Sequence, residues 1–265
     1  MLFFLYNAII DYIFIGNDYM INKGERLEPL GNGVRIIVSD LFHFSTDTIL
    51  LADFANADRA KNAADLGTGC GTIPLLWARE NRNIKISAVE IQPECCNMAR
   101  RSVELNELSN IEIFNEDLKR LRGVLPFGFF DLVSCNPPYK LGGSGITNPD
   151  SEKLLARHEE ACTIDDITLA AKNLLQFGGR VCLCQRPERL ADILESMRKN
   201  DLEPKRLRFV QQRRNKQPKL FLVEGRRGGK NGGLIVEPTL FIEENGDWSD
   251  EMKKIYGSYK ENYYE

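Results

Sequence analysis

Residues 62–76 read NAADLGTGCGTIPLL, and this stretch decides the fold. The apolar run that ends at Leu66 predicts a buried strand, and the run that starts at Thr72 predicts a helix. Between them lie Gly67, Gly69 and Gly71. Glycines in this position let the chain turn tightly and let a ligand approach the backbone at the start of the helix. Packing between helix and strand is the alternative role for these glycines.

The same alternation of strand and helix continues toward the C-terminus. Further strands are expected at residues 84–91, 111–117, 130–136 and 180–185, with helices at 93–108, 165–179 and 187–200. Such a series indicates right-handed βαβ units and a mostly parallel sheet that is covered on both faces. After Pro204, strands at 205–212 and 219–228 follow each other without a helix and predict an antiparallel hairpin. The fold class is therefore α/β and Rossmann-like, with a mostly parallel seven-stranded sheet and a C-terminal antiparallel hairpin.

The segment before the glycine loop predicts a small cap. Residues 24–39 carry a Gly-Asn-Gly turn between β-prone runs, and residues 46–58 have helical spacing. We expect four parts: an extension at 1–19, a hairpin and helix at 20–58 that cap the ligand site, a main domain at 59–245, and a tail at 246–265.

The first residues form an apolar stretch that two aspartates interrupt, Asp11 and Asp18. It is too short and broken for a membrane span, and it lacks a basic start and a small-residue cleavage site. We interpret residues 1–19 as an extension, with the working chain starting near Met20. A signal-like leader and an additional helix are the alternatives.

Composition excludes several classes of protein. The 265 residues are 43% hydrophobic and 28% charged, which is typical of a globular chain, and the net charge of −3 gives no global basic field. A surface for nucleic acid must then be local. The seven cysteines are odd in number and contain no C-x-x-C pair, which argues against a disulfide framework and a zinc site. We expect free thiols, a cytoplasmic protein, no metal and no membrane contact.

The acidic residues around the glycine loop select the ligand. In the nicotinamide fingerprint G-x-G-x-x-G, Thr72 occupies the third glycine position, so that motif is incomplete. Asp65 precedes the loop and would repel a pyrophosphate, but it suits a cationic ligand with a free amino group. S-adenosylmethionine is such a ligand.

Three further carboxylates extend the predicted cofactor site. Glu90, at the end of the next strand, can accept hydrogen bonds from ribose hydroxyls. Asp117 can accept one from an adenine amino group, and Asp47 lies before the sheet. A helix cap or a solvated charge is the alternative role for Asp47 and Asp117.

The stretch FDLVSCNPPYK, residues 130–140, predicts the catalytic corner. Two prolines end the strand, because neither donates an N–H to a sheet ladder. The side-chain oxygen of Asn136 and the carbonyl of Pro137 can hold an exocyclic amine out of plane, which makes its nitrogen nucleophilic. The second proline, Pro138, stiffens the turn, and Tyr139 can stack on the base.

These residues resemble the class I methyltransferases that alkylate planar amino nitrogens. More narrowly, the chain from about Met20 resembles the bacterial tRNA (adenine-N6)-methyltransferases that modify the adenine at position 37 of a valine tRNA. The narrower resemblance is carried by FHFSTDTILLADFA at 42–55, the 24 residues from Asn136 to Glu159, and PKLFLVEGRRGG at 218–229. It implies a tRNA substrate, and cofactor binding at Asp65, Gly67, Gly69, Gly71, Glu90, Asp117 and Asn136. It also implies that the target amine is held at Asn136 and Pro137 and that the base stacks on Tyr139.

A basic segment supplies the expected contacts with RNA. Ten Lys and Arg side chains lie between Lys205 and Lys230, and within this segment only Glu224 opposes them. Such side chains bind phosphates with an affinity that falls with salt. The predicted nucleic-acid contacts are Arg157, His158, Arg213, Arg214, Lys216, Lys219, Arg226 and Arg227. A solvated hairpin and a charged helix surface are the alternatives.

Other functions remain open at this point. A side-chain amide is also planar, so a protein glutamine N5-methyltransferase is an alternative, although only about 45 residues precede the glycine loop from Met20. A methyltransferase that acts on another RNA or on a DNA adenine is a second alternative. A third is an RNA-binding protein without catalysis. The oligomeric state is not predicted.

Overall fold

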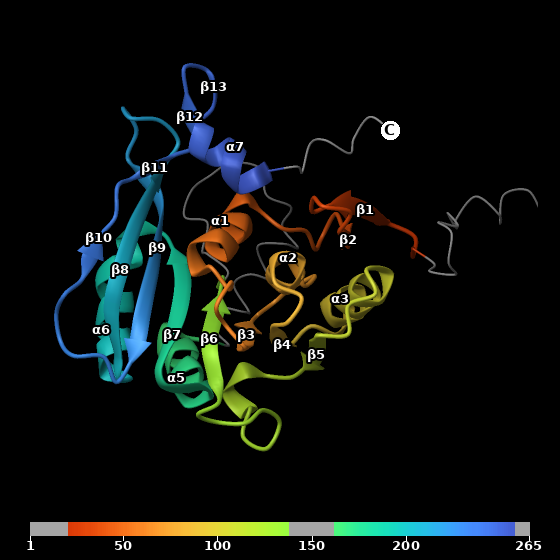
Figure 1. The fold of residues 1–265 in the computed structure, drawn as a ribbon, viewed down its shortest axis with the longest axis horizontal. Helices are drawn as coiled ribbons and strands as arrows, with labels where there is room; N and C mark the ends of the chain where they lie inside the picture. Colours follow the sequence, from red (N-terminus) through yellow and green to blue (C-terminus); the bar gives the residue numbers. More distant parts are fainter. Residues whose placement is uncertain (1–20, 138–161, 258–265) are drawn as a thin grey trace, which may run out of the picture.

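A single large sheet organises the molecule. The computed structural model describes residues 21–137 and 162–257, and within them the sheet has nine strands in the order β10-β8-β9-β7-β6-β3-β4-β5, with β11 also paired to β8 (Figure 1). The strands from the main domain are β3 (Asn62–Leu66), β4 (Lys85–Glu90), β5 (Ile111–Asn115), β6 (Phe130–Cys135) and β7 (Leu175–Gln185). The others are β8 (Leu202–Gln211), β9 (Pro218–Arg227), β10 (Ile235–Val236) and β11 (Leu240–Phe241).

The strand directions confirm the predicted fold class. Strands β3 to β7 are mutually parallel, and β9 is antiparallel to both β7 and β8, which gives the C-terminal hairpin. The seven expected strands are the longer ones, and the two-residue strands β10 and β11 add to the outer side of β8. The carboxyl ends of β3 to β7 therefore meet at one edge, which we call the carboxyl edge.

Helices cover both faces of the sheet and divide the core in two. The first cluster of buried side chains includes residues of α1 (Thr46–Ala55), α2 (Thr72–Glu80), α3 (Pro93–Leu105) and α7 (Asp250–Tyr256). The second includes residues of α5 (Ile164–Leu174) and α6 (Leu190–Lys199). Side chains alternate along a strand, so Ala63 of β3 packs in the first cluster and Ala64 in the second.

The N-terminal hairpin docks on α3. Its strands are β1 (Glu25–Pro29) and β2 (Arg35–Ser39), as the Gly-Asn-Gly turn predicts. The buried hydroxyl of Ser102 accepts a hydrogen bond from the Ile37 backbone N–H at 2.9 Å, and Arg101 pairs with Glu25 through contacts of 2.6 and 2.7 Å. The hairpin is thereby held against α3.

Two segments differ from the expected elements. The helix expected at 165–179 ends at Leu174, and β7 begins directly at Leu175, so the predicted helix is too long. The tail expected at 246–265 contains β13 (Asp247–Trp248), which pairs with β12 (Glu243–Glu244), and α7. Met252 of α7 is fully buried, and the rings of Trp248 and Tyr256 lie 4.4 Å apart.

No helix within the described residues is both long and apolar enough to span a membrane.

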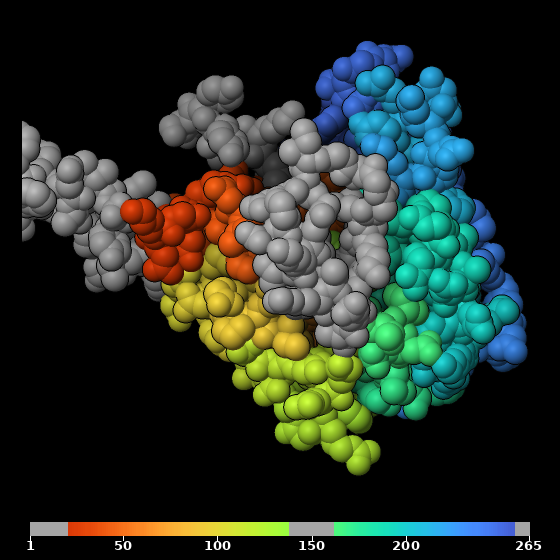
Figure 2. Space-filling view, turned by 180° about the vertical axis from the view of Figure 1, so that it is seen from behind, coloured from red at the N-terminus to blue at the C-terminus, as the bar shows by residue number. Residues whose placement is uncertain are grey.

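The space-filling view shows residues 162–200 beside residues 202–220 on one face of the molecule (Figure 2).

Candidate active site

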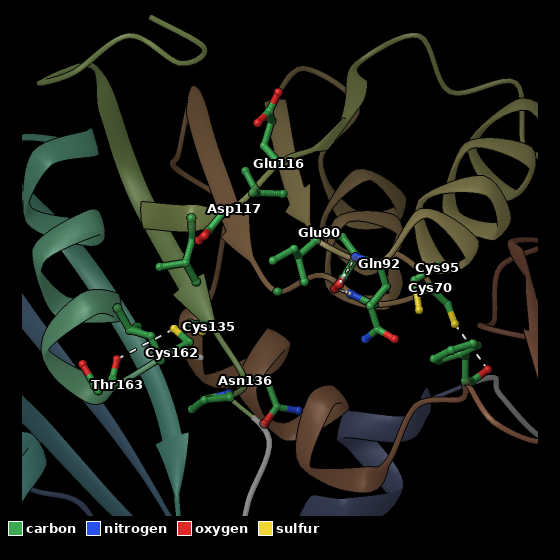
Figure 3. Close-up of a pocket in the computed structure, with 18 of the residues that line it drawn as sticks. Cys70, Glu90, Gln92, Cys95, Glu116, Asp117, Cys135, Asn136, Cys162 and Thr163 are labelled. Atoms are coloured by element: carbon green, nitrogen blue, oxygen red, sulfur yellow. Dashed lines mark hydrogen bonds between the residues drawn. The ribbon is translucent and has the colours of Figure 1, made fainter. Parts of the chain in front are cut away.

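A cavity of about 500 Å³ opens at the carboxyl edge. Six residues that the sequence predicts for the site line it together: Gly67, Gly69, Glu90, Asp117, Asn136 and Pro137. Figure 3 shows Asp117 at one end of this space and Asn136 at the other, with Glu90 between them. Because the cavity lies at β3, where the strand order reverses, it occupies the usual ligand position of an open α/β sheet.

The three loop glycines have two different tasks. Gly67 and Gly69 have positive φ angles of 69° and 56°, and a Cβ at either position would meet no atom within 4 Å. These two residues expose bare backbone to the cavity. Gly71 does not line it; a Cβ there would approach the Ala99 Cβ to 3.2 Å, so this glycine lets α2 pack on α3.

Glu90 is held in place by the backbone. Its side chain is buried, and its two carboxylate oxygens accept hydrogen bonds from the Gly69 and Gln92 N–H groups, each at 2.9 Å. A carboxylate oxygen has two lone pairs. Each oxygen can therefore accept a second hydrogen bond, and Glu90 is preorganised to accept from two ligand hydroxyls.

Asp65 lies behind the loop and does not line the cavity. Ser134 donates a hydrogen bond of 2.5 Å to its carboxylate. The pKa of Asp65 is raised to about 7, chiefly by burial; the hydrogen bond from Ser134 opposes this rise, and the nearby charge of Glu90 adds to it. Asp65 therefore supports the loop from beneath and places a titratable group there.

The far end of the cavity suits a flat ring. Asp117 accepts a hydrogen bond from the Lys119 N–H at 2.9 Å and begins the short helix η1 (Leu118–Arg120). The apolar side chains of Ile91 and Leu118 line the cavity near this carboxylate. A purine that packs against apolar walls could donate its amino hydrogens to Asp117.

Asn136 is clamped between two elements from distant parts of the chain. Its Nδ2 donates to Thr48 Oγ1 of α1 at 2.9 Å, and its Oδ1 accepts from Cys184 Sγ of β7 at 2.9 Å. These bonds fix the orientation of the carboxamide. Pro137 lines the cavity beside it. Pro138 and Tyr139 lie outside the described residues.

Asp47 does not line the cavity, but it lies next to the clamp. It belongs to the first turn of α1, one residue before Thr48. Burial raises the pKa of Asp47, and the positive charges of Arg186 and Lys219 oppose that rise. Its carboxylate therefore faces basic side chains at the carboxyl edge.

Several residues of the cavity wall were not singled out from the sequence. Phe42 and His43 come from the loop after the N-terminal hairpin, and Gln185 and Arg189 come from the end of β7 and the helix η2 (Pro187–Arg189). The sequence predicted that residues 20–58 cap the ligand site, and this prediction pointed to the region of Phe42 and His43. No motif in the sequence pointed to the second pair.

Among the predicted nucleic-acid residues that the structure describes, Arg213 and Arg214 are paired with carboxylates. Arg213 pairs with Glu243 at 2.5 Å, and Arg214 pairs with Glu244 at 2.9 Å. Arg206 and Arg208 also pair with carboxylates beyond the segment, those of Glu237 and Glu251. Glu224 is the only acidic residue within 205–230, but the fold brings further carboxylates to this segment, because the chain after residue 236 folds back along β8.

Arg226 and Arg227 lie far from the cavity. In the sheet register Phe221 pairs with Gln185 at the carboxyl edge, whereas Arg226 pairs with Arg180 near the start of that part of β7. Arg226 lies seven positions after Lys219 along β9, a span of roughly 24 Å. Arg157 and His158 lie outside the described residues.

The cysteines and acidic residues show no metal arrangement. All seven cysteines are free thiols, and Cys135, Cys182 and Cys184 are buried. Within residues 21–137 and 162–257, no three His, Cys, Asp or Glu side chains are grouped as metal ligands.

The cavity fits S-adenosylmethionine in its hydrogen-bond acceptors and its size. Fixed carboxylate oxygens at Glu90 suit ribose hydroxyls, the open backbone at Gly67 and Gly69 admits close approach, and Asp117 lies beside apolar walls. Ligand sites of this kind commonly enclose about 300–1,000 Å³.

Comparisons with known proteins identify the family of the chain. A family model described as the methyltransferase small domain matches residues 44–195. A Porphyromonas gingivalis protein named tRNA1(Val) (adenine(37)-N6)-methyltransferase is 31% identical, over 73% of this chain and 81% of the relative. An Aliivibrio salmonicida protein of the same name is 26% identical, over 80% of this chain and 87% of the relative.

Among solved structures, the fold is similar to that of a predicted O-methyltransferase from Agrobacterium tumefaciens. The TM-score is 0.66 at 23% identity, and the match covers 81% of this chain and 97% of the other. At this identity the likeness concerns the fold alone.

Proposed function

The chain belongs to the methyltransferase small domain family and, within it, to the group named tRNA1(Val) (adenine(37)-N6)-methyltransferases, and we propose that it methylates N6 of adenine 37 in a valine tRNA. It is an S-adenosylmethionine-dependent methyltransferase. The observation that carries the proposal is the clamped carboxamide of Asn136, which lines the same cavity as Glu90 and the glycine loop.

The cofactor supplies an electrophilic methyl group on a positively charged sulfur. In our proposal Glu90 accepts from its ribose hydroxyls, Asp117 accepts from its adenine amino group, and Gly67 and Gly69 admit it to the backbone. Asp65 contributes to cofactor binding indirectly, because it supports the glycine loop. Gly71 contributes indirectly as well, because it lets α2 pack on α3. Asp47 acts at the edge of the site through its charge.

At the other end of the cavity, Asn136 and Pro137 activate the target. Asn136 Oδ1 and the carbonyl of Pro137 accept the two hydrogens of the adenine amine. Holding both hydrogens draws the nitrogen lone pair out of conjugation with the ring and points it at the methyl group. Because two fixed residues supply these acceptors, little orientational freedom is lost on binding. The alkylated amine is acidic enough to lose its proton without a dedicated base.

The substrate base must leave its stack to enter the cavity. Extrusion costs a few kcal/mol in a duplex and less where a base is already single-stranded. We assign Tyr139 to stacking on this base, and Arg157 and His158 to contacts with its nucleotide. RNA shape and an exposed loop base then carry the selectivity.

A competition between acceptors tests the proposal. The protein is incubated with tritiated donor and one of three substrates: an unmodified valine tRNA transcript, an adenine-containing DNA duplex, or a glutamine-containing peptide. We expect label in the tRNA alone, recovered as N6-methyladenosine. Label in the peptide or the DNA with none in the tRNA would reject the proposed substrate.

A further inference from the structure

A groove at the carboxyl edge lies next to the active-site cavity. It has a volume of about 640 Å³ and runs between the helix η2 and the turn that joins β8 to β9. We call it the edge groove. Its lining residues are Arg186, Pro187, Glu188, Gln212, Asn215, Lys216, Gln217, Pro218 and Lys219.

The edge groove and the cavity share a wall. Gln185 and Arg189 line the cavity, and Arg186 to Glu188, which lie between them in the chain, line the groove. The charges of Arg186 and Lys219 act on Asp47, which precedes the Thr48 that holds Asn136. Figure 2 shows the surface of residues 162–200 adjoining that of residues 202–220 on one face. An RNA strand whose target nucleotide lies in the cavity can therefore continue into the edge groove.

The charge of the edge groove is positive. Its charged lining residues are the cations Arg186, Lys216 and Lys219 and the single carboxylate Glu188. Lys216 and Lys219 are exposed, and neither forms an ion pair with any carboxylate of the described residues. Arg213 and Arg214 are paired with glutamates, as described above. The basic charge that is open to a ligand at this edge thus lies in the groove.

The other polar residues of the edge groove also suit a ligand that carries phosphate groups. Asn215 and Gln217 are exposed amides, whose NH₂ groups donate hydrogen bonds. Lys and Arg side chains together with Asn and Gln amides are the groups that contact phosphate oxygens and sugars in nucleic-acid complexes.

We infer that the edge groove binds the phosphate backbone of the substrate RNA beside the nucleotide that enters the active site. This inference rests on the proposed function. It moves the main phosphate contacts from Arg213 and Arg214 to Arg186, Lys216 and Lys219. The RNA then crosses the carboxyl edge and does not follow the hairpin toward Arg226.

Two double variants test the inference on the full-length protein. Lys216→Gln with Lys219→Gln removes two charges from the edge groove. Arg226→Gln with Lys230→Gln removes two exposed charges at the other end of the same hairpin and serves as the matched control. Binding of an unmodified valine tRNA transcript is followed by fluorescence anisotropy over a range of salt concentrations.

For the groove variant, the plot of log K against log salt should have a slope that is smaller in magnitude by about 1.5. Each of the two lost phosphate contacts contributes roughly 0.7–0.9 to that slope. Its tRNA affinity near physiological salt should fall about tenfold. The control should keep the wild-type slope. Equal slopes for both variants and the wild type would overturn the inference, and so would a loss confined to the control.

Calorimetry and a transfer assay separate this inference from the proposed function. Both double variants should bind S-adenosylmethionine with the wild-type Kd, and the groove variant should need a higher tRNA concentration than the control to reach half of its maximal rate. If the wild type labels the tRNA but the groove variant binds it normally, the groove assignment alone fails. If the wild type does not label the tRNA, the proposed function fails.

Discussion

At the scale of single residues, the proposed catalytic asparagine and the groups that hold it differ in how visible they are in the sequence. Asn136 stands in an N-P-P-Y context that points to its chemistry. Thr48 and Cys184 are 88 and 48 positions away. Thr48 lies in the stretch 42–55 that carries the family resemblance, but no local pattern connects either residue to Asn136. Only the packing of α1 and β7 against the end of β6 brings them together.

The clamp predicts a specific effect of Thr48. Thr48→Val keeps the shape of the side chain but removes the acceptor for Asn136 Nδ2, so the carboxamide loses its fixed orientation. We expect kcat to fall about tenfold, equivalent to about 1.4 kcal/mol, with an unchanged Kd for S-adenosylmethionine. Thr48→Ser should restore activity.

The matched control is Thr46→Val, two residues earlier on α1, where the hydroxyl accepts from Tyr256 and not from Asn136. Steady-state kinetics and thermal melts would check the comparison. A Thr48→Val enzyme with normal turnover, or a Thr46→Val enzyme that loses as much, would contradict the positioning role.

Asp65 predicts a pH effect on stability. Its folded pKa of about 7 lies above the usual value near 3.9. Between these values the folded state holds one more proton than the unfolded state, so this group's contribution to the unfolding free energy falls by about 1.4 kcal/mol per pH unit as the pH rises. The full loss is roughly 4 kcal/mol at pH 7 and above.

Asp65→Asn removes this titration while it keeps an acceptor for Ser134. Urea denaturation at pH 5 and pH 8 should show that the stability of the variant relative to the wild type increases with pH. A difference that stays constant over this range would mean that Asp65 does not titrate there.

At the scale of elements, the sequence predicted which helices and strands exist and in what order they follow. It predicted their boundaries less accurately. Glycines after an apolar helix suggested a helix end near residue 179, because glycine often ends helices. In the structure Gly178 and Gly179 belong to β7, where residues 175 and 180 pair with residues 130 and 132 across an irregularity. A Cβ on Gly179 would lie 2.9 Å from the carbonyl oxygen of Phe130, so this glycine serves a bulge.

The docking of the N-terminal hairpin predicts a link between α3 and the cofactor. Ser102→Ala removes the acceptor of the Ile37 N–H and leaves that group buried without its partner. The unfolding free energy should fall by about 1–3 kcal/mol. The loop with Phe42 and His43 should also loosen, which weakens S-adenosylmethionine binding.

Hydrogen exchange and calorimetry would check this prediction. Amides of β2 should exchange faster in the variant, while those of β7 keep the wild-type rate. Uniformly faster exchange in both strands would show global destabilisation without a specific role for the docking contact.

At the scale of the whole molecule, the βαβ series was sufficient to predict the parallel sheet and the shared position of the loops after its strands. It could not predict electrostatic pairing between distant segments. The count of basic residues in the 205–230 segment was correct, but Glu243 and Glu244 reach Arg213 and Arg214 only because β11 returns the chain to β8.

This pairing predicts that the two glutamates limit the affinity for RNA. Glu243→Gln with Glu244→Gln frees both arginines at the carboxyl edge, so tRNA binding should strengthen and its salt dependence should become steeper by about 1–2 in slope. Glu237→Gln, whose partner Arg206 is also bound by Glu224, is the control and should change little. An unaltered slope in the double variant would show that these arginines do not reach the RNA.

The most direct test of the whole account is single-turnover methyl transfer from labelled donor to an unmodified valine tRNA transcript, by the wild type and by Asn136→Ala, with digestion of the product to nucleosides. We predict that the wild type yields N6-methyladenosine, and that the variant binds the donor with the wild-type Kd but transfers at least about a hundredfold more slowly, a loss of about 2.7 kcal/mol. A variant that transfers at the wild-type rate, or label in a different nucleoside, would contradict the account.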